Sequence, residues 1–338
     1  MNQTVFNIKP LSFQWEALDP FLFCVHHEDF YPAGNTDLGP GEKKLTGRNI
    51  GMDFQLKDGW RMYHGQKVPG FPTHPHRGFE TVTIVRKGWV DHTDSMGAAG
   101  RYGNGDVQWM TAGKGVQHAE MFPLVNQDAD NTMELFQIWL NLPKANKFVE
   151  PYYKMFWNED IPIYNFTDAQ NLKTSIEVIA GNIDAITAPA PPPDSWAANP
   201  ENEVAVWIIH MEPKATFDLP VAPNEVNRRL YFYTGDKLSL NHTNLPSYHS
   251  ADLYAGQTVS IRAGEEPCSL LILQGRPMME PVVQHGPFVM NTRQEIQDAF
   301  TEYQQTQFGG WPWKTYEVTH GLNPKRFALY ADGTREEK

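Results

Sequence analysis

Short β-branched runs, each broken by glycine or another turn-forming residue, limit most strongly the folds open to this chain. Residues 81–85, Thr-Val-Thr-Ile-Val, lead to Gly88, and residues 89–90 resume the apolar pattern, which predicts a hairpin. Residues 103–106, Gly-Asn-Gly-Asp, predict a tight turn, and residues 135–140 predict a buried strand. Segments this short favour strands over helices, so we expect an all-β fold.

A second series of strand-like runs follows the first after about residue 160. Its members are residues 175–180, 204–211, 229–234, 258–261 and 269–273. The 338 residues correspond to about two domains of roughly 150 residues. We therefore expect two β-sandwich or barrel domains, residues 1–148 and 149–338. The Pro-rich residues 188–194 lie between strand-like runs, which favours a surface loop inside the second domain over a linker.

One helix is well signalled near the end of the chain. Thr292 and Glu295 have the spacing of a capping box, apolar residues follow at helical spacing to Tyr303, and Gly309 ends the run. The last 25 or so residues are more polar, and we expect them to form a frayed tail.

Composition excludes several classes of protein. A net charge of −12 argues against direct nucleic-acid binding, which needs surplus Lys and Arg. The two cysteines, Cys24 and Cys268, are too few for a disulfide framework. No apolar run approaches 18 residues, so no membrane span is expected, and the first residues lack the pattern of a signal peptide. These features together predict a cytoplasmic protein.

Two pairs of potential metal ligands stand about 40 residues apart. His74 and His76 are two residues apart, as are His118 and Glu120, and residues so spaced in a strand share one face. Three imidazoles and one carboxylate from two strands form a candidate four-ligand site. This donor set suits Fe, Mn, Ni, Cu or Zn, and a six-coordinate ion would keep open positions for substrate or dioxygen.

An ordinary structural role remains the alternative for each of these side chains. A lone His-x-His pair is more often a hydrogen-bonding pair than a metal site, and it is the repetition that favours metal. Glu80 offers another carboxylate four residues after His76. His26 and His27 are adjacent and would point to opposite faces of a strand. We expect the remaining histidines, His92 among them, to be ordinary structural residues.

Longer runs around these residues resemble the pirin family of bicupin proteins. They are residues 18–21 (LDPF), 74–82 (HPHRGFETV), 105–115 (GDVQWMTAGKG), 118–120 (HAE) and 280–292 (EPVVQHGPFVMNT). The resemblance covers most of the chain. It implies an all-β fold of two cupin-type, jelly-roll β-barrel domains with a C-terminal helix.

The resemblance also implies where the metal binds. The N-terminal domain should hold one divalent metal on His74, His76, His118 and Glu120, with Glu80 beside the ligands rather than among them. Fe(II) is the expected ion, and Zn, Mn, Ni, Cu or Co are the alternatives. The second domain has no His-x-His pair, which agrees with a domain free of metal.

Two functions follow from this resemblance. The first is a quercetin 2,3-dioxygenase-like oxidoreductase that acts on a flavonol and dioxygen, with Glu120 as general base. The second is a redox-sensing regulator that binds a transcription factor or a metabolic enzyme, so enzyme status stays open. The chain departs from shorter pirins at residues 31–70, at the Pro-rich 188–200 and after residue 313. The first departure precedes the metal motif and could form part of a pocket rim.

Overall fold

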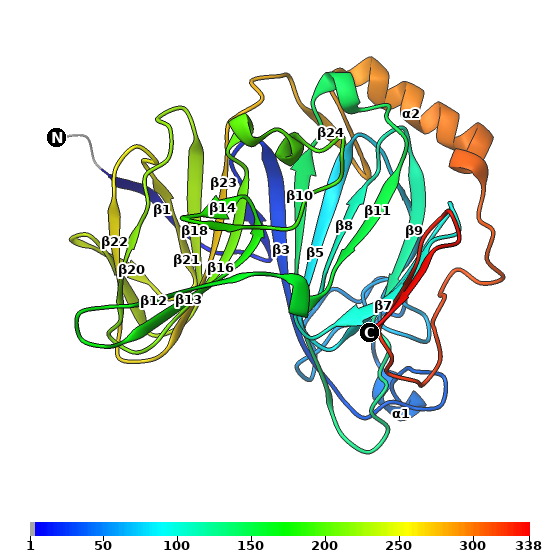
Figure 1. Cartoon of the computed structure of the whole chain (residues 1–338). Coiled ribbons are helices and arrows are strands. Elements are labelled where there is room, and N and C mark those ends of the chain that lie inside the picture. Colours follow the sequence, from blue (N-terminus) through cyan, green and yellow to red (C-terminus); the bar gives the residue numbers. More distant parts are fainter. Residues whose placement is uncertain (1–3) are drawn as a thin grey trace. The chain divides into compact units, whose positions relative to one another are not determined.

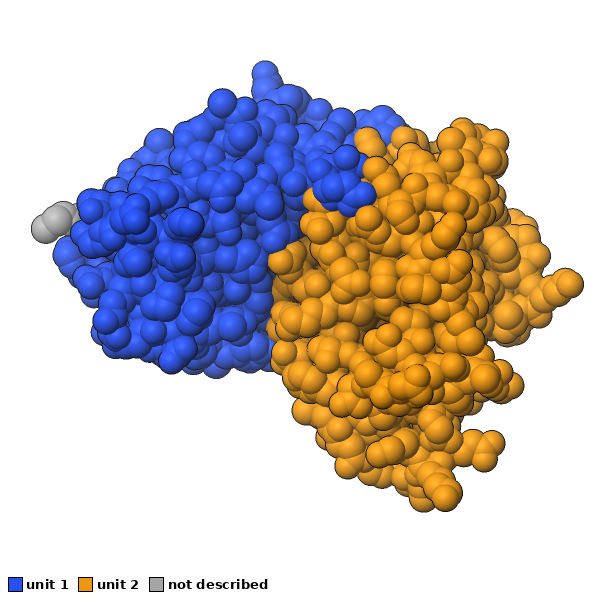
Figure 2. Space-filling view, turned by 60° about the horizontal axis from the view of Figure 1, so that its bottom comes forward, with its two compact units in different colours: residues 1–25, 138–141, 159–279 blue, residues 26–137, 142–158, 280–338 orange. Residues whose placement is uncertain are grey.

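The computed structural model describes residues 4–338 and consists mostly of β-strands, which confirms the predicted all-β class (Figure 1). Two compact units are present, and Figure 2 distinguishes them by colour. Unit 1 contains the described residues up to 25, residues 138–141 and residues 159–279, and unit 2 contains residues 26–137, 142–158 and 280–338.

Unit 1 is built from two antiparallel sheets and a short ribbon. The larger sheet has the order β1-β21-β18-β23-β16-β13-β12, the smaller has the order β17-β22-β19-β20, and β14 pairs with β15. The bounds of these strands are β1 Val5–Pro10, β12 Ile163–Thr167, β13 Lys173–Ala180, β14 Asn182–Ile183, β15 Ile186–Thr187, β16 Ala205–Met211, β17 Thr216–Leu219, β18 Asn227–Thr234, β19 Lys237–Leu240, β20 Thr243–Pro246, β21 His249–Leu253, β22 Val259–Ala263 and β23 Cys268–Gly275. The five runs predicted in the second half of the chain are all strands here.

One apolar cluster fills the space between the two sheets of unit 1. Alternate residues of β16, such as Trp207 and Ile209, contribute from the larger sheet, and Phe217 and Ile261 contribute from the smaller sheet. Period-2 alternation explains this arrangement, because every second side chain of a strand points to the same face. Burial of each large apolar side chain stabilises the fold by about 1.5–3 kcal/mol.

Unit 2 also has two principal antiparallel sheets. The first has the order β11-β8-β5-β10-β3 and the second has the order β27-β26-β7-β6-β9-β4. The bounds are β3 Phe21–Tyr31, β4 Gly70–His76, β5 Phe79–Lys87, β6 Trp89–Asp94, β7 Ala99–Gly103, β8 Val107–Thr111, β9 Val116–Met121, β10 Asn131–Asn141, β11 Tyr152–Phe156, β26 Phe327–Leu329 and β27 Arg335–Glu337. Both β3 and β10 run on into residues of unit 1, where β2 (Gln14–Glu16) pairs with the start of β3.

The remaining elements are short apart from one helix. They are α1 Glu42–Leu45, α2 Arg293–Thr306, β24 Val283–His285, β25 Phe288–Met290 and the 3-10 helices Lys144–Asn146, Asn158–Asp160, Trp196–Ala198, Pro200–Asn202 and Gln307–Gly309. The predicted capping box is confirmed, since the Thr292 side chain accepts from the backbone N–H of Glu295 and the Glu295 side chain accepts from that of Thr292. Neither α-helix of the described chain is long and apolar enough to span a membrane.

The predicted hairpin at Gly88 is wrong. Strands β5 and β6 flank Gly88, but β5 pairs with β8 and β6 pairs with β7 and β9. The chain therefore passes from one sheet of unit 2 to the other at this glycine. Gly88 has a φ of 82°, a left-handed conformation that permits a sharp change of direction at a glycine.

The expectation of a frayed C-terminal tail is also wrong. Strand β26 pairs with β7, and β27 pairs with β26, so the tail extends the second sheet of unit 2. The buried Arg101 binds the tail through the carbonyl oxygens of Gly321 and Asn323, each at 2.6 Å, while its charge is paired with Asp91. Polar composition here reflects a strand at the edge of a sheet rather than disorder.

The two units differ in extent from the expected domains. The expected boundary at residues 148 and 149 falls inside residues 142–158 of unit 2, and residues 280–338 also belong to unit 2. The Pro-rich residues 188–194 lie within unit 1, between β15 and β16, and thus inside a unit as expected.

Candidate metal centre

Strands β4 and β9 bring the two predicted ligand pairs together. The strands are antiparallel neighbours, and His74 lies directly opposite His118. His76 shares the face of His74, and Glu120 shares that of His118, because both pairs have a spacing of two residues. A register shift between Phe71 and His74 places Glu120 opposite Phe71.

The three histidines form a compact cluster. Their nearest ring nitrogens lie within 4.8 Å of one another, and the ring centroids are 4.4 Å apart for His74 and His118, 4.7 Å for His74 and His76, and 4.8 Å for His76 and His118. Burial lowers the pKa of His74 to about 4, and it lowers the pKa values of His76 and His118 well below the usual range. The rings are therefore neutral at physiological pH, which is the state that binds metal.

Hydrogen bonds of the outer ring nitrogens orient two of these rings. Nδ1 of His74 lies 2.9 Å from the carbonyl oxygen of Pro72, and Nδ1 of His76 lies 3.4 Å from that of Pro287. A carbonyl partner holds the proton on Nδ1 and leaves the lone pair on Nε2. Both ring nitrogens of His118 are buried without a hydrogen-bond partner. An imidazole so placed fits a metal ion, because a bound ion would satisfy a nitrogen that is otherwise costly to bury.

Glu120 lies at the edge of this cluster. One of its carboxylate oxygens, Oε2, is 3.7 Å from Nε2 of His118 and accepts a hydrogen bond of 2.8 Å from Gln137. The hydroxyl of Thr83 donates to the other oxygen at 3.2 Å. Burial raises the pKa of the carboxyl group, while these two donors favour its ionised form.

Other residues considered from the sequence have partners elsewhere. Glu80 is on β5 and accepts a hydrogen bond of 2.6 Å from Thr111. His26 lies 3.4 Å from a carboxylate oxygen of Glu134, and Nδ1 of His27 lies 2.8 Å from the hydroxyl of Tyr63. None of these side chains belongs to the three-histidine cluster, which is the only such group among residues 4–338.

His92, expected from the sequence to be an ordinary structural residue, lies beside the cluster. Its ring centroid is 5.6 Å from that of His118, and the ring stacks on Tyr153 at 4.9 Å. His92 Nε2 lies 3.3 Å from Oδ2 of Asp94, and β6 places His92 opposite Glu120. The available signal was another spacing of two residues, His92 and Asp94, in a strand-like run between the two ligand pairs.

A cavity of about 320 Å³ opens at His74. Its wall includes His64 and Gln66 from the insertion at residues 31–70, together with Tyr316 and Glu317 from the tail. The Glu317 carboxylate accepts hydrogen bonds from the backbone N–H groups of Gln66, Lys67 and Val68, which fastens the tail to the insertion. The insertion therefore forms part of a rim beside the cluster, as expected.

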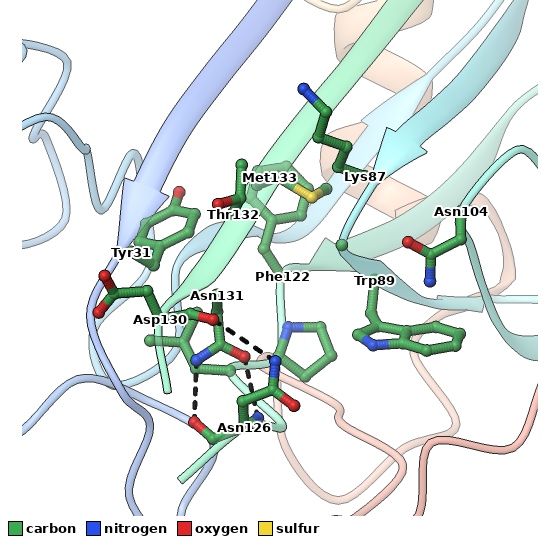
Figure 3. A pocket seen from close by; sticks show the side chains of 13 residues that line it. Tyr31, Lys87, Trp89, Asn104, Phe122, Asn126, Asp130, Asn131, Thr132 and Met133 are labelled. Carbon is green, nitrogen blue, oxygen red and sulfur yellow. Dashed lines mark hydrogen bonds between the residues drawn. The ribbon is translucent and has the colours of Figure 1, made fainter. Parts of the chain in front are cut away.

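A second cavity in unit 2, of about 290 Å³, has no histidine in its wall (Figure 3). It lies among Tyr31, Lys87, Trp89, Asn131 and their neighbours. Asn131 donates hydrogen bonds to the carbonyl oxygens of Pro32 and Asn126, so its amide stabilises the adjoining loops. This cavity is separate from the candidate metal centre.

Comparisons with known proteins agree with the earlier resemblance. Residues 12–140 match the family model described as Pirin, and residues 206–309 match that described as Pirin C-terminal cupin domain. Human pirin is 32% identical over 264 residues, which cover 77% of this chain and 84% of that protein. A Vibrio cholerae protein provisionally named a quercetin 2,3-dioxygenase is 36% identical over 244 residues, or 71% of this chain and 80% of its own.

Among solved structures, the fold is similar to that of a quercetin 2,3-dioxygenase from Acinetobacter baumannii. The TM-score is 0.69 at 27% sequence identity, and the match covers 91% of this chain and 96% of the other. Together with the matched C-terminal cupin domain, this similarity confirms the predicted cupin fold.

Proposed function

The chain belongs to the pirin family, and from this membership we propose that it is a metal-dependent dioxygenase of the quercetin 2,3-dioxygenase type, acting on flavonols. The observation that carries this proposal is the cluster of three neutral histidines, with His76 and His118 buried and His74 half-buried at a cavity of about 320 Å³. Cavities of this size are in the range that holds small organic ligands.

We assign His74, His76, His118 and Glu120 as the ligands of one divalent metal ion, with Fe(II) as the expected ion. A metal ion held there would act as a Lewis acid toward the flavonol oxygens and would supply redox chemistry toward dioxygen. The support comes from the donor set, because three imidazoles and one carboxylate suit a redox-active ion with open positions.

Glu120 is the proposed acceptor of the flavonol hydroxyl proton. Burial raises the pKa of this carboxyl group and makes the carboxylate a stronger base than an exposed glutamate. Hydrogen bonds from Gln137 and Thr83 hold one carboxylate oxygen each, and they fix the direction in which the base can accept a proton.

Aromatic side chains near the histidines would keep water from the reacting groups. The ring of Phe79 lies 4.9 Å from that of His76, and the ring of Phe71 lies 6.3 Å from that of His74. At the cavity, Tyr316 and His64 provide polar and aromatic surface that a planar polyphenol could contact.

Turnover of quercetin tests this proposal. The full chain is reconstituted with Fe(II), and the loss of flavonol absorbance is followed together with oxygen uptake and carbon monoxide release. We expect all three signals in the wild-type protein and their loss in His118→Ala. Absence of turnover in metal-loaded wild-type protein, or unchanged turnover in His118→Ala, contradicts the dioxygenase. A partner protein retained only in one oxidation state of the metal would instead favour the regulator.

A further inference from the structure

Unit 1 contains a cavity of about 510 Å³ beside the Pro-rich segment. Three residues of its wall, Ala205, Gln274 and Arg228, are direct neighbours across β16, β23 and β18. Such a cross-strand row projects from one face of a sheet. Trp207 is two residues after Ala205 on the same face and also lines the cavity.

Arg228 carries a buried charge in this wall. Only 1% of its surface is exposed, and its guanidinium donates to the side-chain oxygen of Gln274 at 2.7 Å and to the carbonyl oxygen of Pro220 at 2.8 Å. Both acceptors are neutral, and Nη2 makes no hydrogen bond within the described part of the chain. Burial lowers the pKa of Arg228 to about 10, so the side chain is still a cation near pH 7.

The neighbouring Arg229 has the carboxylate partner that Arg228 lacks among the residues that the structure describes. Its guanidinium points to the opposite face of β18 and binds both carboxylate oxygens of Asp252. Buried cations are ordinarily compensated in this way, because an uncompensated charge is expensive to remove from water. Arg228 has no carboxylate within 4.0 Å in residues 4–338, and the charge of Glu203 acts on it only from a greater distance, so a bound anion would add to this compensation.

Trp207 supplies a second donor without an acceptor. Its indole N–H is buried and makes no hydrogen bond. Buried indole N–H groups usually have a partner, so an acceptor at this place would remove a cost. Arg228 and Trp207 both line this cavity, so a carboxylate that reached the guanidinium and the indole N–H would accept hydrogen bonds from both.

The rest of the wall limits the class of anion. Part of it is apolar, with Ile183, Ala188, Pro189, Pro191, Val204 and Val221. Asp184 and Glu203 are also in the wall, and the charge of Glu203 raises the pKa of Arg228. Two acidic groups disfavour a dianion such as a phosphate monoester, whereas a singly charged ligand with an apolar body suits both parts of the wall.

We propose that unit 1 binds a small monocarboxylate with an apolar body in this cavity, with Arg228 as the charge partner and the Trp207 indole N–H as a second donor. This site goes beyond the flavonol dioxygenase proposed for unit 2, and it requires no metal.

Benzoate is the probe, with benzamide as its neutral counterpart and inorganic phosphate as an anion without an apolar body. Indole N–H resonances of the full chain, labelled with 15N-tryptophan, are recorded during each titration, and Trp207→Phe assigns the Trp207 signal. We expect benzoate to shift this signal saturably below about 10 mM, with benzamide and phosphate at least about tenfold weaker.

Variants give the matched comparison, with benzoate binding measured by calorimetry. Arg228→Gln should weaken binding at least about tenfold, and Trp207→Phe should weaken it about threefold. Arg276→Gln, which removes a half-exposed arginine outside the cavity wall, should leave binding unchanged.

Three results would overturn the proposal: no saturable shift of the Trp207 signal, equal affinity for benzamide and benzoate, or unaltered binding in a folded Arg228→Gln protein. If that variant does not fold, the comparison of benzoate with benzamide and the Trp207→Phe titration decide the question. Because none of these measurements involves metal or flavonol, failure of this site is distinguishable from failure of the dioxygenase.

Discussion

The two units bury different kinds of polar group although both are built from paired antiparallel sheets. Between the sheets of unit 1 lies an apolar cluster that includes Trp207, Ile209 and Ile272. Unit 1 also buries the ion pair of Arg229 with Asp252, whereas unit 2, beside its own apolar side chains, buries His76, His118 and Glu120. Polar groups in an interior reduce stability unless they have partners. The comparison teaches that fold class alone does not determine function, because within residues 4–338 the candidate metal centre lies in unit 2 only.

Removal of one histidine of the three-histidine cluster should give the largest loss of metal affinity. Removal of a histidine of unit 1 should give none. We expect His118→Ala to lower metal affinity more than about 100-fold, because loss of a ligand exceeds the 10–100-fold cost of losing a residue that supports one. Metal content by mass spectrometry after dialysis measures this change.

His210→Ala is the matched control from unit 1. His210 lies 2.8 Å from the Ser269 hydroxyl oxygen and 3.2 Å from a Glu177 carboxylate oxygen, an ordinary structural environment. Its replacement should leave the metal content unchanged. Equal metal loss in the two variants would break the distinction between the units.

A substitution that opens a cavity in the apolar cluster of unit 1 should lower the stability of the protein without changing its metal content. Ile209 is fully buried in unit 1, so Ile209→Ala should lower the free energy of unfolding by about 2–5 kcal/mol. Ile163→Ala, at a half-exposed position, should change it by less than about 0.5 kcal/mol. Denaturant unfolding measures both, and a large loss of metal in Ile209→Ala would contradict the separation.

Gln137 tests whether a hydrogen bond to the proposed ligand Glu120 contributes to the metal affinity of unit 2. Its amide donates to Glu120 at 2.8 Å, so Gln137→Leu should lower metal affinity about 10–100-fold. Competition with a chelator measures the affinity. Gln284→Leu, at an exposed position of β24, is the control and should behave as the wild type. Wild-type affinity in Gln137→Leu would show that Glu120 needs no such support.

Acid should destabilise unit 2 through His27. Burial lowers the pKa of His27 from 6.5 to about 3, so the unfolded chain takes up a proton at a higher pH than the folded one. The stability contribution is complete above pH 6.5 and is lost progressively as pH falls from 6.5 to 3. At pH 5 the loss amounts to about 2 kcal/mol.

The comparison of wild-type protein with His27→Gln isolates this contribution, since all other groups titrate in both proteins. Denaturant unfolding at pH 7.5 and pH 5 gives the difference for each. We expect the wild type to lose about 2 kcal/mol more than the variant. An identical pH dependence of the two proteins would exclude His27 as the source.

Local patterns accounted for the strands, the capped helix and the paired ligands. His74, His76 and His118 could be grouped because a spacing of two residues places side chains on one face of a strand, and the rule depends only on neighbouring residues. The capping box at Thr292 is local in the same way.

Features that depend on distant pairing could not be predicted. Nothing near Gly88 indicates that β5 and β6 enter different sheets, and nothing in the polar tail indicates that β26 pairs with β7. Arg228 and Arg229 are adjacent in a strand-like run, yet only Arg229 faces a carboxylate. The sequence shows that they alternate in direction, but not what each one meets.

The most direct test of the account is anomalous X-ray scattering from crystals of the metal-loaded protein, measured at the absorption edge of the bound element. We predict one metal peak among His74, His76 and His118, next to Glu120, and none inside unit 1. A peak elsewhere with none at the three histidines, or a peak within the interior of unit 1, would contradict the assignment of the metal centre to unit 2.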